Sequence, residues 1–189
     1  MYKIIAIVGR SGSGKTTVCQ FLEQKYPDLF NVVQSYTTRS PRYENEYGHT
    51  FDKTTEDFEY DSNQGTIISK AELYNRKYWA TTQQLCQNRV NLYVIDYSGY
   101  LQIKCNPLLE VCPIYLTVPT AVIIDRLKER YSNQEELDYR ISSDDEMFSF
   151  NKQDFHIVDG FQRSIEDIAK QFVKTVNRVW GKNKGGSSK

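Results

Sequence analysis

An apolar run leads directly into a glycine-rich segment near the start of this chain. The run at 4–8 reads IIAIV, which is typical of a parallel strand buried on both faces. The segment at 9–16 reads GRSGSGKT and matches the pattern G-x-x-x-x-G-K-[ST] in full. Apolar residues then recur at helical spacing until Pro27. Strand, glycine loop and helix in this order predict a three-layer α/β fold with a parallel central sheet.

The glycine loop predicts a polyphosphate site. Its glycines let successive backbone N–H groups point into one concavity, and the helix that follows adds its positive dipole there. Lys15 is expected to place its charge on the β- and γ-phosphates of a nucleoside triphosphate, and the Thr16 hydroxyl is expected to bind Mg²⁺. The loop alone does not distinguish GTPases, motors, transporters and small kinases. The alternative interpretation of the loop is a glycine-rich turn that merely joins strand to helix. Thr17 can instead be an ordinary residue of the helix that does not contact the phosphates. The predicted ATP-binding residues are Gly9, Arg10, Ser11, Gly12, Ser13, Gly14, Lys15, Thr16 and Thr17.

The rest of the chain alternates short apolar runs with amphipathic segments. Strands are predicted at 31–34, 92–96, 114–118 and 155–158, with weaker extended segments at 66–69 and 78–82. Helical structure is predicted as a turn at 71–75, at 82–89, from Pro119 onward, at 132–147 with a cap at Ser132, and at 165–180 with a cap at Ser164. We therefore expect a single domain at 1–180 and a disordered tail at 181–189.

Positive and negative charges balance in this chain. The 24 Lys and Arg against 24 Asp and Glu leave no overall positive field to hold a nucleic acid. No apolar run approaches the roughly 20 residues of a membrane span, and the N-terminus carries no signal-peptide pattern. Four cysteines without CxxC spacing predict reduced thiols, and two histidines argue against a zinc site. These patterns predict a cytoplasmic protein with neither nucleic acid nor membrane as a partner.

Two arginines in a polar stretch form a second candidate anion site. Arg39 and Arg42 stand three residues apart, and Pro41 stiffens the link between them. Because the planar guanidinium pairs bidentately with phosphate oxygens, one phosphate can be bound by both side chains. A solvated polar loop is the alternative interpretation.

With these residues in place, the sequence resembles the guanylate kinase family over about residues 4–180. Besides the glycine loop, the resemblance rests on the run Ser35–Arg42 with Gly48, on Tyr78, on Asp96 with Gly99, and on Arg126, Arg130 and Arg140. It implies ATP-dependent phosphoryl transfer to a nucleoside monophosphate. It also implies a P-loop fold with a small monophosphate-binding insertion at about 35–82 and a helical lid at about 126–147.

The resemblance implies a role for each matching side chain. Arg39, Arg42 and Tyr78 hold the acceptor phosphate, while Ser35 and Asp96 face its base. Arg126 lies near ATP. The catalytic set is Lys15, Arg39, Arg130 and Arg140.

Two of these assignments have alternatives. Surface ion pairing is the alternative for the lid arginines, since 135–146 is rich in carboxylates, and the acidic residues at 144–146 are expected to balance charge elsewhere. Asp96 has the alternatives of orienting Mg²⁺ through water or capping the next turn.

Some positions depart from the family pattern. Ser69 stands where the family has a guanine-reading glutamate, Trp79 and Ala80 replace a glycine and a small hydroxyl residue, and Phe51 replaces a tyrosine. Glu72 is a candidate substitute for the glutamate, and Tyr43 or Tyr47 for the tyrosine hydroxyl.

Three functions follow from the resemblance. The leading expectation is an ATP- and Mg²⁺-dependent kinase for GMP or dGMP, whose partners are small-molecule nucleotides, with no protein partner evident. A kinase for another monophosphate is the first alternative. A phosphopeptide-binding module is the second, and the intact Lys15-Thr16 pair argues against it.

Overall fold

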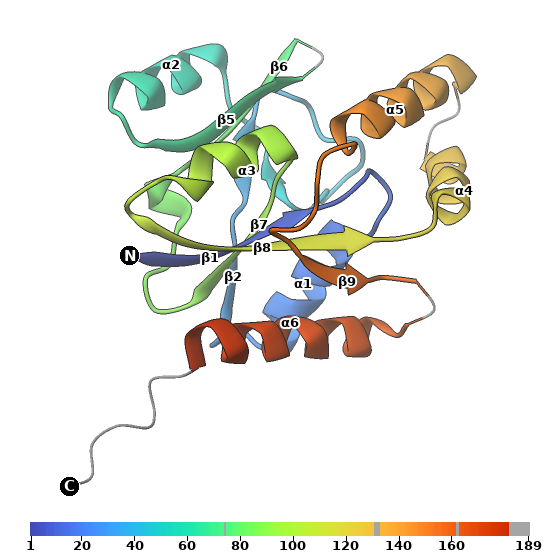
Figure 1. Cartoon of the computed structure of the whole chain (residues 1–189). Helices are drawn as coiled ribbons and strands as arrows, with labels where there is room; N and C mark the ends of the chain where they lie inside the picture. The colour runs from blue at the N-terminus through green and yellow to red at the C-terminus, as the bar shows by residue number, and fades with distance from the viewer. Residues whose placement is uncertain (74, 131–132, 162, 182–189) are drawn as a thin grey trace, which may run out of the picture.

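The computed structural model describes residues 1–73, 75–130, 133–161 and 163–181. Its centre is a five-stranded sheet in the order β2-β7-β1-β8-β9, in which every neighbouring pair is parallel. Helices α1 and α6 cover one face of this sheet and α3 covers the other, so the predicted three-layer α/β fold is confirmed (Figure 1). The bounds are β1 (Tyr2–Val8), β2 (Phe30–Val32), β7 (Val90–Val94), β8 (Leu109–Thr117), β9 (His156–Asp159), α1 (Lys15–Lys25), α3 (Tyr97–Lys104) and α6 (Ile165–Trp180).

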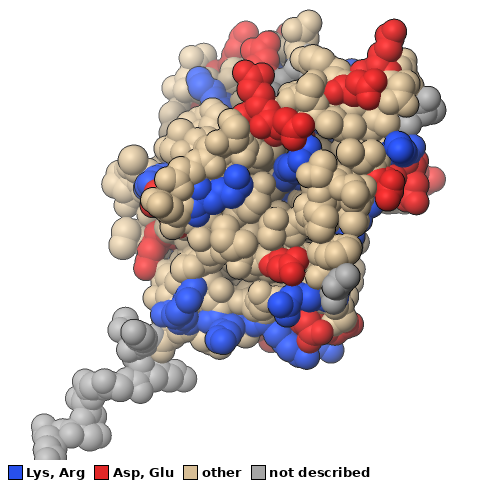
Figure 2. Space-filling view, turned by 45° about the vertical axis from the view of Figure 1, so that its right-hand side comes forward, with Lys and Arg blue, Asp and Glu red and all other residues tan. Residues whose placement is uncertain are grey.

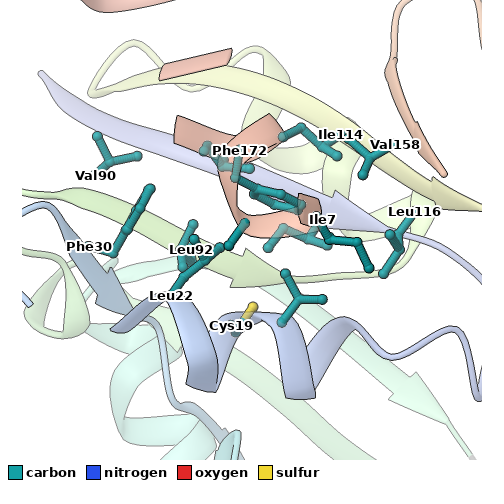
Figure 3. Close-up of a cluster of buried hydrophobic side chains, with 14 of the residues drawn as sticks. Ile7, Cys19, Leu22, Phe30, Val90, Leu92, Ile114, Leu116, Val158 and Phe172 are labelled. Atoms are coloured by element: carbon teal, nitrogen blue, oxygen red, sulfur yellow. The ribbon is translucent and has the colours of Figure 1, made fainter. Parts of the chain in front are cut away.

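Strand β1 is buried on both faces, as its unbroken apolar run predicts. Ile5 and Ile7 belong to the core under α1 and α6, which contains Leu22 and Phe172 (Figure 3). Ile4 and its alternate neighbours belong to a second core under α3. Each such buried side chain contributes on the order of 1.5–3 kcal/mol. The strand that feeds the glycine loop is therefore held from both sides.

A second, smaller sheet lies beside the first and has the order β4-β3-β6-β5. Its strands β5 and β6 form an antiparallel hairpin, so the predicted helical turn at 71–75 is wrong for 71–73 and 75, while Tyr74 lies outside the described residues. Helix α2 covers this hairpin and begins at a capping box between Thr54 and Asp57. The bounds are β3 (Ser35–Thr37), β4 (His49–Thr50), α2 (Thr55–Asn63), β5 (Ile67–Leu73) and β6 (Arg76–Thr81).

The predicted helix at 82–89 is also wrong, apart from a short 3₁₀ turn at Thr82–Gln84. The buried Asn91 side chain explains the difference. Its Oδ1 accepts a hydrogen bond from the Cys86 backbone N–H, and its Nδ2 donates to the Cys86 carbonyl. These two bonds satisfy backbone groups that a helix would otherwise pair.

Two helices form an arm over the glycine loop, α4 (Thr120–Arg130) and α5 (Gln134–Met147). They pack together through Ile123, Leu127 and Leu137. The predicted cap Ser132 lies outside the described residues, as does 182–189 of the predicted tail. The cap of α6 is confirmed, since Ser164 accepts a hydrogen bond from the Asp167 backbone N–H. Within the described part of the chain, no helix combines the length and apolar character needed to cross a membrane.

Candidate functional site

A cavity of about 1110 Å³ opens where β1 and β7 end, between the glycine loop, the second sheet and the α4–α5 arm. It exceeds the roughly 300–1,000 Å³ of an ordinary small-molecule site. On the face that Figure 2 shows, positive and negative side chains are interspersed. The predicted site residues that line the cavity are Gly9, Ser11, Gly12, Ser13, Gly14, Lys15, Thr16, Thr17, Ser35, Arg39, Arg42, Tyr78, Asp96, Arg126, Arg130 and Arg140.

Arg10 differs from the rest of the predicted set. Its side chain lines a neighbouring pocket of about 370 Å³, where it donates to the Thr120 hydroxyl and pairs with Asp145 at 2.8 Å. The arginine therefore ties the glycine loop to both helices of the arm.

The glycine loop has the backbone that its sequence predicts. Gly12 and Gly14 have φ angles of 76° and 90°, a region that disfavours side chains. A Cβ atom on Gly9 would lie 2.6 Å from the Leu116 carbonyl oxygen. The loop therefore needs glycine at these positions.

Lys15 is half-buried inside this loop. Its Nζ donates to the carbonyls of Gly9 and Arg10 at 2.6 and 2.8 Å. Burial lowers the pKa of Lys15 to about 8, with Arg140 and Arg130 also lowering it and Asp144 opposing them. A desolvated ammonium that bonds to neutral carbonyls favours binding of an anion, so the loop fits a polyphosphate.

Asp144 of α5 lies against the glycine loop. Its carboxylate accepts hydrogen bonds from the Ser11 backbone N–H at 2.6 Å and from the Ser11 hydroxyl at 3.3 Å, and the residue is only 4% exposed. The expectation that all of 144–146 balances charge away from the site is therefore wrong for Asp144. Sequence reasoning missed this contact because 133 positions separate the two residues.

Two predicted lid arginines also contact the loop. Arg140 Nε donates to the Ser11 hydroxyl at 3.0 Å, and Arg126 donates to the Gly12 carbonyl at 2.9 Å. Arg130 is exposed and lines the same cavity. The arm thus brings cations to the mouth of the glycine loop.

The second anion site is built around a carboxylate that the sequence did not single out. Glu46 binds Arg39 bidentately at 2.9 and 3.0 Å, and accepts from both the backbone N–H and the guanidinium of Arg42. Burial alone would raise the pKa of Glu46, but the bonds from Arg39 and Arg42 hold it at about 2. The one available signal was its i,i+4 spacing from Arg42.

The Arg39 guanidinium also contacts an aromatic ring. Its Nε is buried without a hydrogen-bond partner among the described residues, and the guanidinium lies 5.0 Å from the ring centroid of Phe51. An aromatic face at this distance stabilises the cation. Phe51 therefore stabilises the Arg39 cation, although it lacks the hydroxyl group of the tyrosine that the family pattern has at this position.

The two tyrosines proposed as substitutes for that hydroxyl are placed differently. The Tyr47 hydroxyl donates to Glu23 at 2.6 Å, and Tyr43 is 59% exposed at the rim of the cavity. His49 instead enters the acceptor region and was not predicted. Its Nδ1 lies 2.8 Å from the Ser35 hydroxyl, and burial, then Arg39, lower its pKa to about 4.

The wall nearest the predicted base position carries neutral hydroxyls. The Ser69 hydroxyl lies 2.6 Å from that of Tyr93. Asp96 caps α3 by accepting from the Gly99 N–H at 2.6 Å, which is one of its predicted alternatives. Glu72 cannot replace the family's glutamate, because it lies on a strand, is exposed, and points with Lys77 toward the opposite face of the hairpin.

The residues present fit a metal that arrives with a nucleotide. Over the described ranges, no group of three or more His, Cys, Asp or Glu side chains is arranged to hold an ion. Thr16 lines the cavity at the start of α1, where a hydroxyl can complete the oxygen shell of Mg²⁺ alongside phosphate oxygens. The site thus fits Mg²⁺ bound together with phosphates.

A glycine loop between a buried strand and a helix, facing an arginine clamp across one cavity, defines a P-loop nucleotide-binding protein. A family model described as an AAA domain matches residues 5–148. The guanylate kinase of Homo sapiens is 31% identical over 140 residues, which covers 70% of this chain and 70% of that protein. The chain belongs to the guanylate kinase family.

More distant relatives agree with this membership. The guanylate kinase of Mycoplasma genitalium is 28% identical over 184 residues, which covers 94% of this chain and 73% of that protein. Among solved structures, guanylate kinase from Anaplasma phagocytophilum superposes with a TM-score of 0.67 at 17% identity, covering 94% of this chain and 86% of that one. That structural similarity establishes the shared fold.

Proposed function

We propose that this protein is an ATP-dependent nucleoside monophosphate kinase that converts GMP and ATP to GDP and ADP, with dGMP as a second acceptor. The observation that carries the proposal is the pairing of two anion sites in one cavity. The glycine loop with Lys15 is one site, and the Arg39–Arg42 clamp is the other. A reaction that moves a phosphoryl group between two nucleotides requires this arrangement.

Each side of the cavity has a proposed task. Lys15 and the loop N–H groups bind the ATP phosphates, and Thr16 holds Mg²⁺, which neutralises phosphate charge when bound. Arg39, Arg42 and Tyr78 hold the acceptor phosphate. Catalysis then consists of positioning two nucleotides in line while cations stabilise the migrating charge.

The arm supplies the remaining cations. Arg140 already contacts Ser11 of the loop, and Arg130 lines the cavity beside it. When both nucleotides are bound, we expect these two arginines to contact the transferring phosphoryl group. Closure of the arm also excludes water that would otherwise hydrolyse ATP.

The test is an assay of ADP production with Mg·ATP and a panel of ribo- and deoxyribonucleoside monophosphates. The expected result is turnover that requires an acceptor, with GMP or dGMP among the substrates. The variant Lys104→Ala is the control for a substitution outside the site, because Lys104 pairs with Asp154 away from the cavity. An absence of acceptor-dependent turnover would overturn the proposed function and favour a binding module.

A further inference from the structure

Two buried hydroxyls from different sheets meet in the wall of the acceptor region. Ser69 comes from β5 and Tyr93 from β7, and both line the cavity at only 3% and 4% exposure. Their oxygens are 2.6 Å apart, and either atom can be the donor. Opposite Ser69 on β6 stands Ala80, whose side chain has no polar group to compete for this bond.

This pair is neutral and can reverse its direction. Burial raises the pKa of Tyr93, so its phenol stays protonated at physiological pH. When Tyr93 donates to Ser69, the Ser69 proton is free to be donated to a ligand. When Ser69 donates to Tyr93, the Ser69 oxygen can accept a hydrogen bond from a ligand.

The neighbouring carboxylate lacks this freedom. Asp96 can only accept hydrogen bonds while ionised, and its Oδ1 is already bonded to the Gly99 N–H. A carboxylate at the position of Ser69 would likewise accept only, and would repel a lone pair on a base. The direction of the hydrogen bond between Ser69 and Tyr93 is therefore the property of this wall that can change to suit a ligand.

Purine bases differ at the atom that such a wall would meet. Guanine and hypoxanthine carry a proton on N1, whereas adenine N1 has a bare lone pair. We propose that the Ser69–Tyr93 pair contacts the N1 edge of the acceptor purine and accommodates both forms, so that the site takes GMP, IMP and AMP. This inference rests on the proposed function and extends its acceptor class.

The energetic consequence is a small preference among purines. Leaving one buried polar group unpaired costs on the order of 1–3 kcal/mol, which is roughly a 5- to 150-fold loss. Since the pair can satisfy either form of N1, neither base incurs this loss. The expected values of kcat/KM for GMP, IMP and AMP lie within about tenfold of one another.

The experiment compares these three acceptors in the wild type and in Ser69→Glu. The glutamate accepts only, so the ratio of GMP to AMP turnover is expected to rise at least tenfold. Ser62→Glu is the matched control, because it adds the same charge to the exposed end of α2 and should leave the ratio unchanged. Wild-type selectivity for GMP over AMP above about tenfold, or an unchanged ratio in Ser69→Glu, would overturn the inference.

A thermal melt reports whether the Ser69→Glu variant folds. If it does not fold, Tyr93→Phe provides the second test of the inference. Without its partner, Ser69 is held less firmly, and kcat/KM for GMP and AMP should each fall several-fold while the melting temperature stays near that of the wild type. Unchanged kinetics in Tyr93→Phe would overturn the inference. A wild type that consumes no acceptor at all is a different result, because it overturns the proposed function itself.

Discussion

The Asp144 carboxylate accepts a hydrogen bond of 2.6 Å from the Ser11 backbone N–H, so α5 places a negative charge inside the glycine loop. The second anion site repeats this relationship, with Glu46 held by Arg39 and Arg42. In both places a carboxylate of the chain meets groups that are proposed to bind phosphate. Nucleotide binding must therefore displace or accommodate two internal anions.

Asp144→Asn is expected to strengthen ATP binding. The amide keeps the shape of the side chain but removes a charge that opposes the triphosphate, a change of about 1 kcal/mol or roughly fivefold in the KM for ATP. Glu146→Gln is the matched control, because that neighbour is exposed and lines neither pocket. Steady-state kinetics at varied ATP measure the effect. A weaker affinity in Asp144→Asn than in Glu146→Gln would show that the carboxylate supports the loop.

Arg39→Ala is expected to affect the acceptor far more than ATP. It removes the bidentate partner of Glu46 and the buried Nε, so the KM for the monophosphate should rise at least tenfold while that for ATP changes less than about twofold. Stability should fall as well, because the buried Glu46 loses its main counter-ion. Kinetics with each substrate varied in turn, together with a thermal melt, separate the two effects. Equal losses for both substrates would contradict the assignment.

Lys15→Met should abolish phosphoryl transfer and leave the fold intact. Methionine keeps the apolar stem of the side chain but removes the cation that bonds the Gly9 and Arg10 carbonyls. A loss of at least about a hundredfold in kcat is expected, as for other groups that stabilise transferred charge. ADP production measures it, and circular dichroism checks the fold. Near-normal turnover would rule out the role given to Lys15.

The half-buried His49 predicts a specific pH dependence of stability. Its pKa is lowered from 6.5 to about 4 by burial, then by Arg39, so the unfolded chain binds a proton more readily than the folded one. The free energy of unfolding should therefore fall as pH drops from about 6.5 to about 4, by up to roughly 3 kcal/mol. Glu46, Arg39 and Arg42 face this ring and keep their charges across that range.

Denaturant titrations at several pH values check this expectation. His49→Asn should flatten the stability profile between pH 6.5 and 4. His156→Asn is the matched control, since His156 lies at the sheet edge beside Arg178 and also has a lowered pKa. A profile that flattens in His156→Asn but not in His49→Asn would contradict the prediction.

Elements with a regular hydrophobic period were predictable from the sequence. The buried run of β1, the loop after it and the apolar stripe of α6 each carry a local signal that packing reinforces. The second sheet carries no such signal. The strand β3 has three residues and β4 has two, and their pairing joins positions that are distant in the sequence. In the hairpin of β5 and β6, the weak extended segments predicted at 66–69 and 78–82 largely coincide with strands. The helical turn predicted between them is wrong for 71–73 and 75, because pairing across strands overrides local propensity.

The residues of the candidate site also fall into those that the sequence predicted and those that it did not. Side chains that belong to recognisable motifs, such as Lys15 and Arg39, line the cavity as expected. Their partners Asp144 and Glu46 were missed, because a carboxylate in a polar stretch looks like an ordinary surface residue until the fold brings it to a cation or an amide. His49 was missed for the same reason. Sequence motifs indicate which groups are candidates to bind phosphate, whereas the tertiary structure determines which side chains contact those groups.

The contact between Ser69 and Tyr93 crosses the seam between the two sheets. A displacement of the second sheet by about the width of a water molecule would separate the two oxygens and let solvent enter between them. If this pair contacts the base as proposed, recognition of the acceptor depends on the relative placement of the two sheets. Substitutions where β5 packs against α3 are then expected to change the choice of acceptor.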